Sequence, residues 1–331
     1  MATMKEVAER AGVSVATVSY VLNDARKVRP ETERRVLSAA KELGYSPNTA
    51  ARSLVVGRSS MVGLIVPDIG NPFFPEITKS FQDAARLSGL ETIVMNTNYD
   101  LQRTRDTVDR LVSLQVPGAA FLTSQVDPVI RLKLSAKEIC AVYLDHGVAG
   151  PHISGIAIDY EHGIQAAVAH LLELGHRRIG FIGGPANGSA AKLRKFAFLD
   201  SVSARTDIEG RVVDSDFSVQ GGYFSCSKLL NDFPATAVMA ANDMMAIGAL
   251  HCAYDRKTAV PAEISIVGFD DITFAQFTQP ALTTVAVPRE DIGRLAFQSL
   301  WSLVSDSSRA GMEYEVKTRL VVRQTTAPPG K

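Results

Sequence analysis

Residues 3–23 constrain the fold of this chain most strongly, because they encode two short helices separated by a tight turn. Thr3 and Glu6 have the spacing of a capping box, so a helix should begin after Thr3. Gly12 interrupts that helix, and Ser14 is a favourable N-cap for a second one. Apolar residues recur at helical spacing, at Val7, Ala8 and Ala11 and then at Val15, Val18, Val21 and Leu22. The pattern predicts a helix-turn-helix, whose second helix can enter the major groove of DNA.

A third helix is predicted to start at Pro30 and to end before Gly44, with Glu31 and Glu33 near its positive end. Its expected apolar stripe consists of Val36, Leu37, Ala40 and Leu43. Residues 46–54 then form a short segment that begins with Ser-Pro, and a helix of this length is mostly unfolded when isolated in water. Such a linker would fold only when DNA and a second subunit hold it.

The chain has a basic amino end and an acidic remainder, although its net charge is zero. Residues 1–58 contain ten Lys or Arg and six Asp or Glu, so they carry +4 and residues 59–331 carry −4. A positive end beside a negative body suits contact with nucleic-acid phosphates at one end only.

Length and composition predict a multidomain protein of the cytoplasm. The 331 residues exceed the usual size of one domain, and 46% hydrophobic residues can fill a large core. The sequence shows neither a signal segment nor an apolar stretch long enough to span a bilayer. Cys140, Cys226 and Cys252 have no metal-binding spacing and are odd in number, so we expect buried thiols in a reducing compartment.

From residue 59 onward, short apolar runs alternate with amphipathic stretches. The apolar runs are typical of buried parallel strands: MVGLIV, ETIVM, GAAFL, ICAVYL, RIGFIG, TAVMAA and ISIVGF. The stretches between them predict helices at 74–88, 101–115, 161–174, 189–204, 218–231 and 243–255. This alternation predicts βαβ units in an α/β core, with helices on both faces of the sheet.

Several segments, taken in order, resemble the lactose-repressor (LacI/GalR) family of bacterial transcription regulators: VAERAGVSVATVSYVLN, VRPETERRVL, LGYSPNTAARSL, GLIVPDIGNPFF, GHRRIGFIGGP, ANDMMAIGAL, ISIVGFDD, ALTTV and TRLVVRQTTAPP. The resemblance implies an all-α helix-turn-helix domain at 1–45, a hinge helix and linker at 46–58, and a core at 59–331. The core would have two similar lobes with parallel sheets, as in type I periplasmic binding proteins. The expected lobes are approximately 59–158 plus 289–318 and 159–288 plus 319–331.

The same resemblance implies a homodimer that binds a near-palindromic DNA operator. Val15, Ala16 and Tyr20 would face base edges, and Leu54 would wedge into the central base step. The full set of expected DNA-binding residues is Ser14, Val15, Ala16, Thr17, Ser19, Tyr20, Asn23, Asn48, Ala51, Arg52 and Leu54. Residues 325–331 contain no heptads, so a tetramer-forming coiled coil is not expected.

Polar and aromatic residues follow several predicted strands, where open α/β sheets bind ligands. Planar hydrogen-bonding groups and aromatic faces are what a sugar site requires. Resemblance to the ribose-binding branch of the sugar-binding fold implies an effector site of Asn71, Phe73, Phe74, Asp145, His146, Lys192, Arg194, Phe217, Asn242 and Asp270.

Two alternatives to a sugar effector stay open. Lys192 and His146 stand where the ribose-binding branch has arginines, and Val287 falls near the position of a glutamine, so ribose itself is left unassigned. The purine-binding branch has polar readers where this chain has Gly188 and Ala190, so a purine corepressor is the less favoured alternative. The other alternative is the same DNA-binding regulator under the control of a protein partner.

Enzymatic function is not expected. The glycine run at 178–185 lacks the spacing of a dinucleotide-binding loop, and the sequence has no P-loop, nucleophile elbow or zinc-binding helix. His176 is expected to be solvated beside Arg177 and Arg178. We expect a repressor with no cofactor and no metal, whose operator affinity is controlled by a small molecule.

Overall fold

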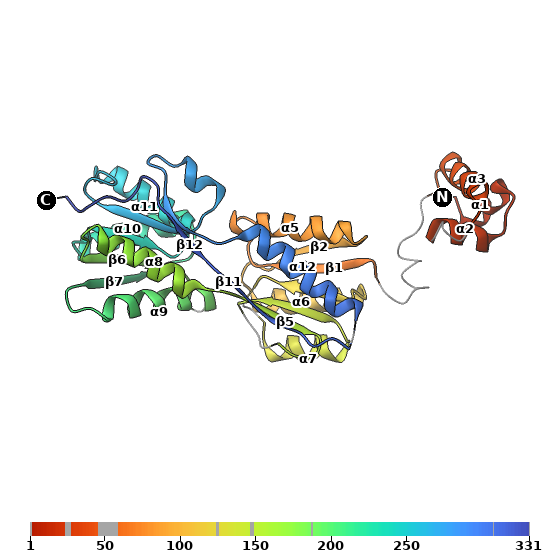
Figure 1. Ribbon diagram of the computed structural model, residues 1–331, viewed down its shortest axis with the longest axis horizontal. Helices are drawn as coiled ribbons and strands as arrows, with labels where there is room; N and C mark the ends of the chain where they lie inside the picture. Colours follow the sequence, from red (N-terminus) through yellow and green to blue (C-terminus); the bar gives the residue numbers. More distant parts are fainter. Residues whose placement is uncertain are drawn as a thin grey trace. The chain divides into compact units, whose positions relative to one another are not determined.

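The computed structural model describes residues 2–23, 28–45, 59–123, 126–145, 149–186, 188–306 and 308–330. The chain divides into two compact units, Met1–Ser60 and Met61–Lys331 (Figure 1). Among the helices of these described ranges, none is long and apolar enough to cross a membrane.

The first unit is a small helical domain made of α1 (Met4–Ala11), α2 (Val15–Asn23) and α3 (Pro30–Glu42). The capping box before α1 is confirmed, with both reciprocal hydrogen bonds between Thr3 and Glu6. Gly12 ends α1 with φ +64°, a left-handed conformation that glycine adopts without strain. Its core is formed by Val7, Ala8, Ala11, Val18, Val21, Val36, Ala39 and Ala40.

Two positions of the predicted apolar stripe of α3 are wrong. Leu37 and Leu43 are exposed, whereas Ala39 is buried beside Val36 and Ala40. Residues three and four apart share a helical face, so the face that contains Val36 continues at Ala39 and Ala40 and excludes Leu37. Leu43 is the C-cap and lies beyond the last helical residue.

The second unit has two α/β lobes, as predicted. The first lobe contains a sheet of parallel pairs in the order β11-β5-β4-β3-β1-β2. Its strands are β1 (Met61–Val66), β2 (Glu91–Asn96), β3 (Gly118–Phe121), β4 (Cys140–Leu144), β5 (Ile153–Ile158) and β11 (Glu313–Val316). Helices α5 (Phe73–Leu87) and α12 (Arg289–Ser305) pack on one face of this sheet, and α6 (Leu101–Ser113) and α7 (Pro128–Ala136) pack on the other (Figure 1).

The second lobe contains a sheet in the order β12-β10-β9-β8-β6-β7. Its strands are β6 (Arg178–Gly183), β7 (Glu209–Asp214), β8 (Ala237–Ala240), β9 (Ser265–Asp270), β10 (Thr283–Ala286) and β12 (Arg319–Val321). The sheet departs from the predicted parallel arrangement at one edge, where β12 runs antiparallel to β10. The helices form two pairs, α8 (Tyr160–Glu173) with α9 (Ser189–Ser203) and α10 (Val219–Asp232) with α11 (Asp243–Asp255).

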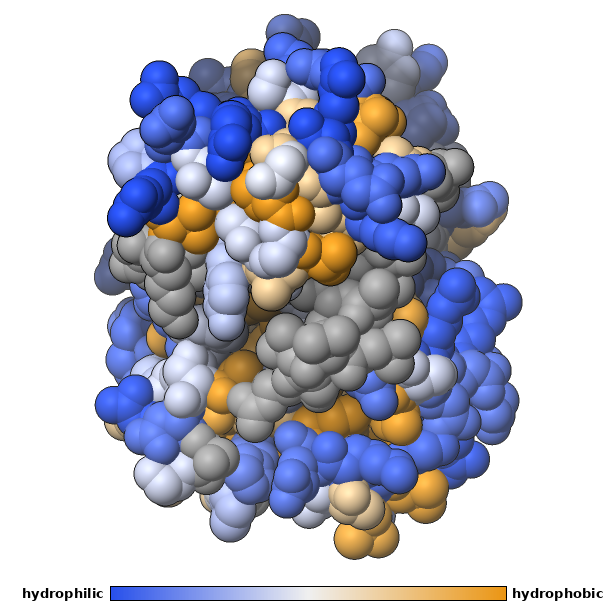
Figure 2. Space-filling view, turned by 90° about the vertical axis from the view of Figure 1, so that its right-hand side faces the viewer, coloured by the Kyte–Doolittle hydropathy of each residue, from blue (hydrophilic) through white to orange (hydrophobic). Residues whose placement is uncertain are grey.

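The chain crosses from one lobe to the other at residues 158–160, 286–289 and 316–319. These crossings bring the ends of the two sheets close together, so that a site can form between the lobes. Alternate residues of β1 pack into different clusters, Val62 and Leu64 on the side of α5 and Ile65 on the side of α6. Apolar side chains are thus inside, and hydrophilic residues predominate on the face shown in Figure 2, where hydrophobic ones form separate patches.

His176 is not solvated, contrary to the prediction. Its ring is buried and lies within hydrogen-bond distance of Thr236 Oγ1, Ser265 Oγ and the carbonyl oxygen of Ala327. The ring links the strand ends of the second lobe to the carboxyl-terminal segment, which the local run of basic residues does not reveal.

Candidate functional sites

The first candidate site is the outward face of α2. Val18 and Val21 point into the core of the helical unit, so the other faces of α2 remain available. Val15 is 45% exposed and Tyr20 is 54% exposed, so both side chains are accessible on the outward side of α2. The Ser14 hydroxyl accepts a hydrogen bond from the Thr17 amide at 3.1 Å and so caps the helix. This geometry gives α2 a surface of apolar and hydroxyl groups suited to the edges of bases.

Some predicted residues cannot be placed. The side chain of Asn23 and the residues Asn48, Ala51, Arg52, Leu54 and His146 lie outside the described residues.

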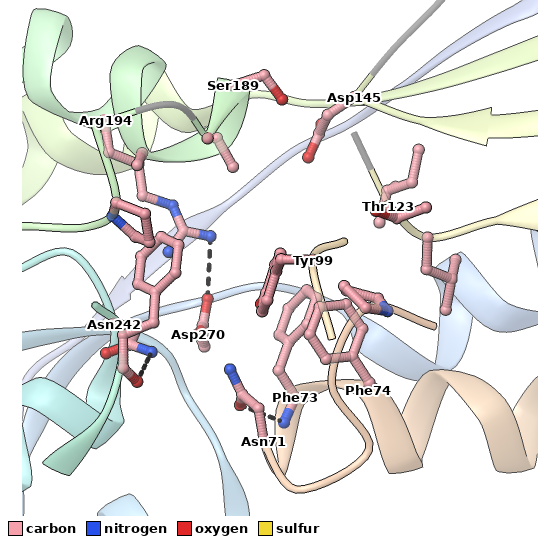
Figure 3. Close-up of a pocket in the computed structure, with 18 of the residues that line it drawn as sticks. Asn71, Phe73, Phe74, Tyr99, Thr123, Asp145, Ser189, Arg194, Asn242 and Asp270 are labelled. Atoms are coloured by element: carbon pink, nitrogen blue, oxygen red, sulfur yellow. Dashed lines mark hydrogen bonds and ion pairs between the residues drawn. The ribbon is translucent and has the colours of Figure 1, made fainter. Parts of the chain in front are cut away.

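The second candidate site is a cavity of about 140 Å³ between the lobes of the core. Side chains from the ends of both sheets line it (Figure 3). The lining residues are Pro67, Asn71, Phe73, Phe74, Tyr99, Leu122, Thr123, Leu144 and Asp145 from the first lobe, and Tyr160, Pro185, Gly188, Ser189, Ala190, Ala191, Arg194, Phe217, Asn242 and Asp270 from the second.

A buried ion pair lies at the side of the cavity formed by the second lobe. Arg194 Nη2 is 3.2 Å from Asp270 Oδ1, and their side chains are only 6% and 4% exposed. Arg194 Nη1 also donates to the carbonyl oxygen of Ala241. The guanidinium carbon lies 4.3 Å from the ring centroid of Phe269 and 4.6 Å from that of Tyr160. Aromatic faces and a carboxylate therefore hold this cation away from solvent.

A second carboxylate lies at the end of β4. Asp145 Oδ1 accepts a hydrogen bond of 3.0 Å from the Ile158 amide, and Oδ2 accepts one from the Tyr160 hydroxyl. Tyr160 begins α8 directly after β5, so the crossing between the lobes brings the two side chains together. Burial raises the pKa of Asp145 to about 6, against the opposing effect of these hydrogen bonds.

The pKa of Asp270 is also raised to about 6, because burial outweighs the attraction of Arg194 and Arg289. Burial is the largest influence on the pKa of Arg194 and lowers it, but Asp270, Tyr160 and Asp145 together outweigh burial, so the net change is upward. The cavity thus contains two carboxyl groups that titrate near neutral pH and a permanent cation.

Several cavity residues have unusual backbone conformations. The φ angles are +55° at Tyr99, +54° at Asp145, +69° at Phe217 and +110° at Asp270. Non-glycine residues rarely adopt positive φ, and such conformations cluster at ligand sites because the surrounding structure must hold them. Their concentration around one cavity supports a binding role.

The aromatic residues lie mainly opposite the ion pair. Figure 3 shows Phe73, Phe74 and Tyr99 across the cavity from Arg194 and Asp270. Phe73 and Phe74 pack edge to face with ring centroids 5.1 Å apart. They offer a ligand apolar surface on the first-lobe side of the cavity.

The two predicted asparagines have local structural roles as well as lining the cavity. Asn71 Oδ1 accepts from the Phe73 amide at 3.1 Å, which leaves its side-chain NH2 group to donate. Asn242 caps α11 through the Met245 amide at 2.9 Å, and its Nδ2 donates to the Phe217 carbonyl oxygen at 3.0 Å. Both polar atoms of the Asn242 side chain thus form hydrogen bonds within the protein, so its main role is to stabilise the backbone around the site rather than to contact a ligand.

Lys192 does not belong to the cavity, contrary to the prediction. Ala191 and Arg194 point inward from α9, whereas Lys192 is exposed. Ala191 and Arg194 are three residues apart and share the buried face of α9, whereas Lys192 is on its solvent-exposed side.

Sequence reasoning missed four polar residues that line the cavity, namely Tyr99, Thr123, Tyr160 and Ser189. Ser189 begins α9, and the Ser189 hydroxyl is buried without a hydrogen-bond partner among the described residues. Arg194 Nε is likewise buried and unpartnered among them. Unpaired buried polar groups are rare, so the pair marks where a polar ligand would form hydrogen bonds.

The stability of the chain is expected to depend on pH through Asp145. Its folded pKa of about 6 exceeds the unfolded value of about 3.9, so its contribution to stability is present at low pH and is lost as pH rises through 6. Asp145→Asn is uncharged at every pH and tolerates the left-handed backbone. In urea unfolding, wild type should lose up to about 3 kcal/mol relative to this variant between pH 4 and pH 7. A pH-independent difference would contradict the assignment.

Comparisons with known proteins place both sites in context. A family described as bacterial regulatory proteins, lacI family, matches residues 3–48, and a periplasmic binding protein-like domain matches residues 168–326. The HTH-type transcriptional repressor PurR of Proteus mirabilis is 36% identical over 332 residues, covering 99% of this chain and 97% of its own length. The ribose operon repressor of Halalkalibacterium halodurans is 35% identical, covering 98% of this chain and 97% of its own.

The fold of this chain is also similar to that of a solved repressor structure. A lac repressor dimer bound to operator and the anti-inducer ONPF matches with a TM-score of 0.86 at 27% identity. The match covers 98% of this chain and 99% of that one.

Proposed function

Because this chain belongs to the lacI family of bacterial regulatory proteins, and is a non-enzymatic DNA-binding repressor controlled by an effector, we propose that its effector is a sugar bound in the interlobe cavity. Two copies of the chain bind a near-palindromic operator in the cytoplasm, each through the exposed face of α2. The relative crystallised with operator is likewise a dimer.

The observation that carries the sugar proposal is the chemistry of the cavity lining. Asp145 and Asp270 supply carboxylate oxygens that accept hydrogen bonds from hydroxyl groups. Phe73 and Phe74 supply apolar surface for the C–H face of a sugar ring. The unpaired Ser189 hydroxyl adds a further hydrogen-bonding group at the same surface.

A purine effector is the second candidate, because relatives named for purine and for ribose regulation match this chain almost equally. Gly188 and Ala190 line the cavity at the positions where the purine-binding branch has polar readers. Neither side chain can form a hydrogen bond with the edge of a base. The lack of a hydrogen-bonding side chain at these two positions favours a sugar over a purine as the effector.

A monosaccharide such as D-ribose is expected to raise the melting temperature progressively with the logarithm of its concentration above Kd, since it binds only the folded chain. Asp270→Ala should weaken the affinity measured by calorimetry about 30-fold or more, because the change removes an acceptor and leaves Arg194 without its carboxylate partner. Lys192→Ala is the matched control on the same lobe and should bind as wild type does.

Equal affinities of wild type and Asp270→Ala would show that the sugar binds elsewhere. A thermal response to purine bases and to no sugar would favour the purine alternative, and no response to either class would favour control by a protein partner.

A further inference from the structure

Glu76 on the first turn of α5 is bound by two residues from distant parts of the core. Its Oε1 accepts a hydrogen bond of 2.7 Å from Thr273 Oγ1, and its Oε2 accepts one of 2.8 Å from Arg289 Nε. Both carboxylate oxygens are therefore occupied by groups nearly 200 or more residues away in the sequence. A surface carboxylate engaged in this way serves to fix elements relative to one another.

Arg289 makes a second contact, which reaches the effector cavity. Its Nη1 donates to the backbone carbonyl oxygen of Asp270. Asp270 is the residue with φ +110° whose carboxylate pairs with Arg194 in the cavity. The side chain of Arg289 is only 10% exposed, so solvent screens these contacts weakly.

Arg289 and Glu76 belong to one rigid part of the first lobe. Helix α12 packs closely on α5, and a Cβ on Gly293 would lie only 2.3 Å from the carbonyl oxygen of Ile77. Ser80 Oγ also donates to the carbonyl oxygen of Glu290 at 2.6 Å. The two helices are therefore closely packed, as expected for a unit that moves as one body.

Thr273 and Asp270 belong to the second lobe. Thr273 begins η2 (Thr273–Phe277), the 3₁₀ helix after β9. The preceding loop is held to that lobe by the Ile272 amide, which donates to Asp243 Oδ2 at 2.8 Å, and by the ion pair of 2.6 Å between Asp271 and Arg323. The contact of Thr273 with Glu76 and that of Arg289 with the Asp270 carbonyl oxygen thus both cross between the lobes.

We propose that Glu76, Thr273 and Arg289 form a latch that holds the two lobes in the arrangement of this structure, here called closed, and positions Asp270 for the effector. The regulatory meaning of the latch rests on the proposed function. A ligand that contacts Asp270 favours the lobe arrangement in which the latch is formed. Because Glu76 lies on α5, the change in lobe arrangement is transmitted to this helix of the first lobe. The three residues are positioning residues, since none of them lines the cavity.

The test measures the lobe arrangement directly, without any effector. Spin labels are attached to the full-length chain at Leu132→Cys on α7 and Phe196→Cys on α9, one exposed position in each lobe. The native cysteines are buried, and dilution with unlabelled chain restricts the measurement to distances within one chain. Pulsed electron resonance then gives the distribution of the label-to-label distance.

Wild type is expected to show a dominant closed population. Thr273→Val and Arg289→Met each remove one crossing contact and should shift the closed-to-open ratio about tenfold towards open, the effect expected for a hydrogen bond to a charged or buried group. Thr273→Ser keeps the hydroxyl and should restore the wild-type distribution. Ser80→Ala is the matched control, because it removes a hydrogen bond between α5 and α12 within one lobe.

Wild-type distributions in both Thr273→Val and Arg289→Met would overturn the proposal, and so would an equal shift in Ser80→Ala. Calorimetry with D-ribose separates this result from failure of the proposed function. If D-ribose binds, the two latch variants should bind it more weakly in proportion to the closed population that they lose, about twofold when the closed-to-open ratio falls from about 10:1 to about 1:1. If wild type does not bind any sugar, the sugar proposal fails while the distance measurement still decides the latch.

Discussion

Replacing Arg194 with methionine is expected to lower the free energy of unfolding by about 3–5 kcal/mol at pH 7, because Asp270 then becomes a buried carboxylate without its cation. Methionine keeps much of the side-chain volume and can still contact the rings of Tyr160 and Phe269. The pKa of Asp270 is about 6, so at pH 5 this group is largely protonated in wild type and the loss should be smaller. Urea unfolding at the two pH values measures the difference.

A double-mutant cycle provides the control for this prediction. Arg194→Met combined with Asp270→Asn should be less destabilised than the sum of the single changes, because neither charge is then left unpaired. Arg294→Met breaks the exposed pair with Asp291 and should cost less than about 1 kcal/mol. Additive effects, or an Arg194→Met loss as small as that of Arg294→Met, would show that the ion pair does not govern the stability of the core.

A chain that begins at Met61 is expected to lose operator binding altogether while keeping sugar binding. The exposed face of α2 and the excess of ten basic over six acidic residues both lie in residues 1–58. Affinity of the full-length chain should fall steeply with salt, since each phosphate neutralised releases counterions. Fluorescence anisotropy with labelled operator measures both effects. Operator binding by the shortened chain, or a flat salt response of the full-length chain, would contradict the assignment of operator binding to residues 1–58.

Elements with a local physical cause could be predicted from the sequence. The capping box at Thr3 and Glu6 and the glycine turn at Gly12 depend on neighbours within four residues, and both are present. Continuous apolar runs were also sufficient to predict the central strands, since β1 spans the MVGLIV segment and β9 begins one residue inside ISIVGF. The two-lobe division came from the family resemblance, because alternation of strands and helices is compatible with one large sheet as well.

Elements without a continuous apolar run escaped prediction. Strand β7 lies at a sheet edge and is largely exposed, so its sequence EGRVVD lacks the apolar character of a central strand. Strand β5 contains Gly155 and an exposed Ala157, which interrupt its pattern. Because β5 was not predicted, the position of Tyr160 directly after it was also missed.

Tertiary contacts explain the remaining differences in the cavity. Tyr99 follows β2 in a left-handed turn, and nothing in its local sequence indicates that this turn faces the other lobe. Lys192 was assigned from a family position, but the inward face of α9 is set by Ala191 and Arg194. The latch of Glu76, Thr273 and Arg289 joins residues far apart in sequence, so it can be recognised only in three dimensions.

Control of operator binding by a sugar in the interlobe cavity is tested most directly by one titration. Operator affinity of the full-length chain is measured by anisotropy in the presence of a panel of monosaccharides and, separately, of purine bases. At least one monosaccharide should change operator affinity fivefold or more, the lower range of allosteric coupling, and Asp270→Ala should abolish this change. A response to purine bases and to no sugar, or a sugar response unaffected by Asp270→Ala, would contradict control by a sugar in this cavity.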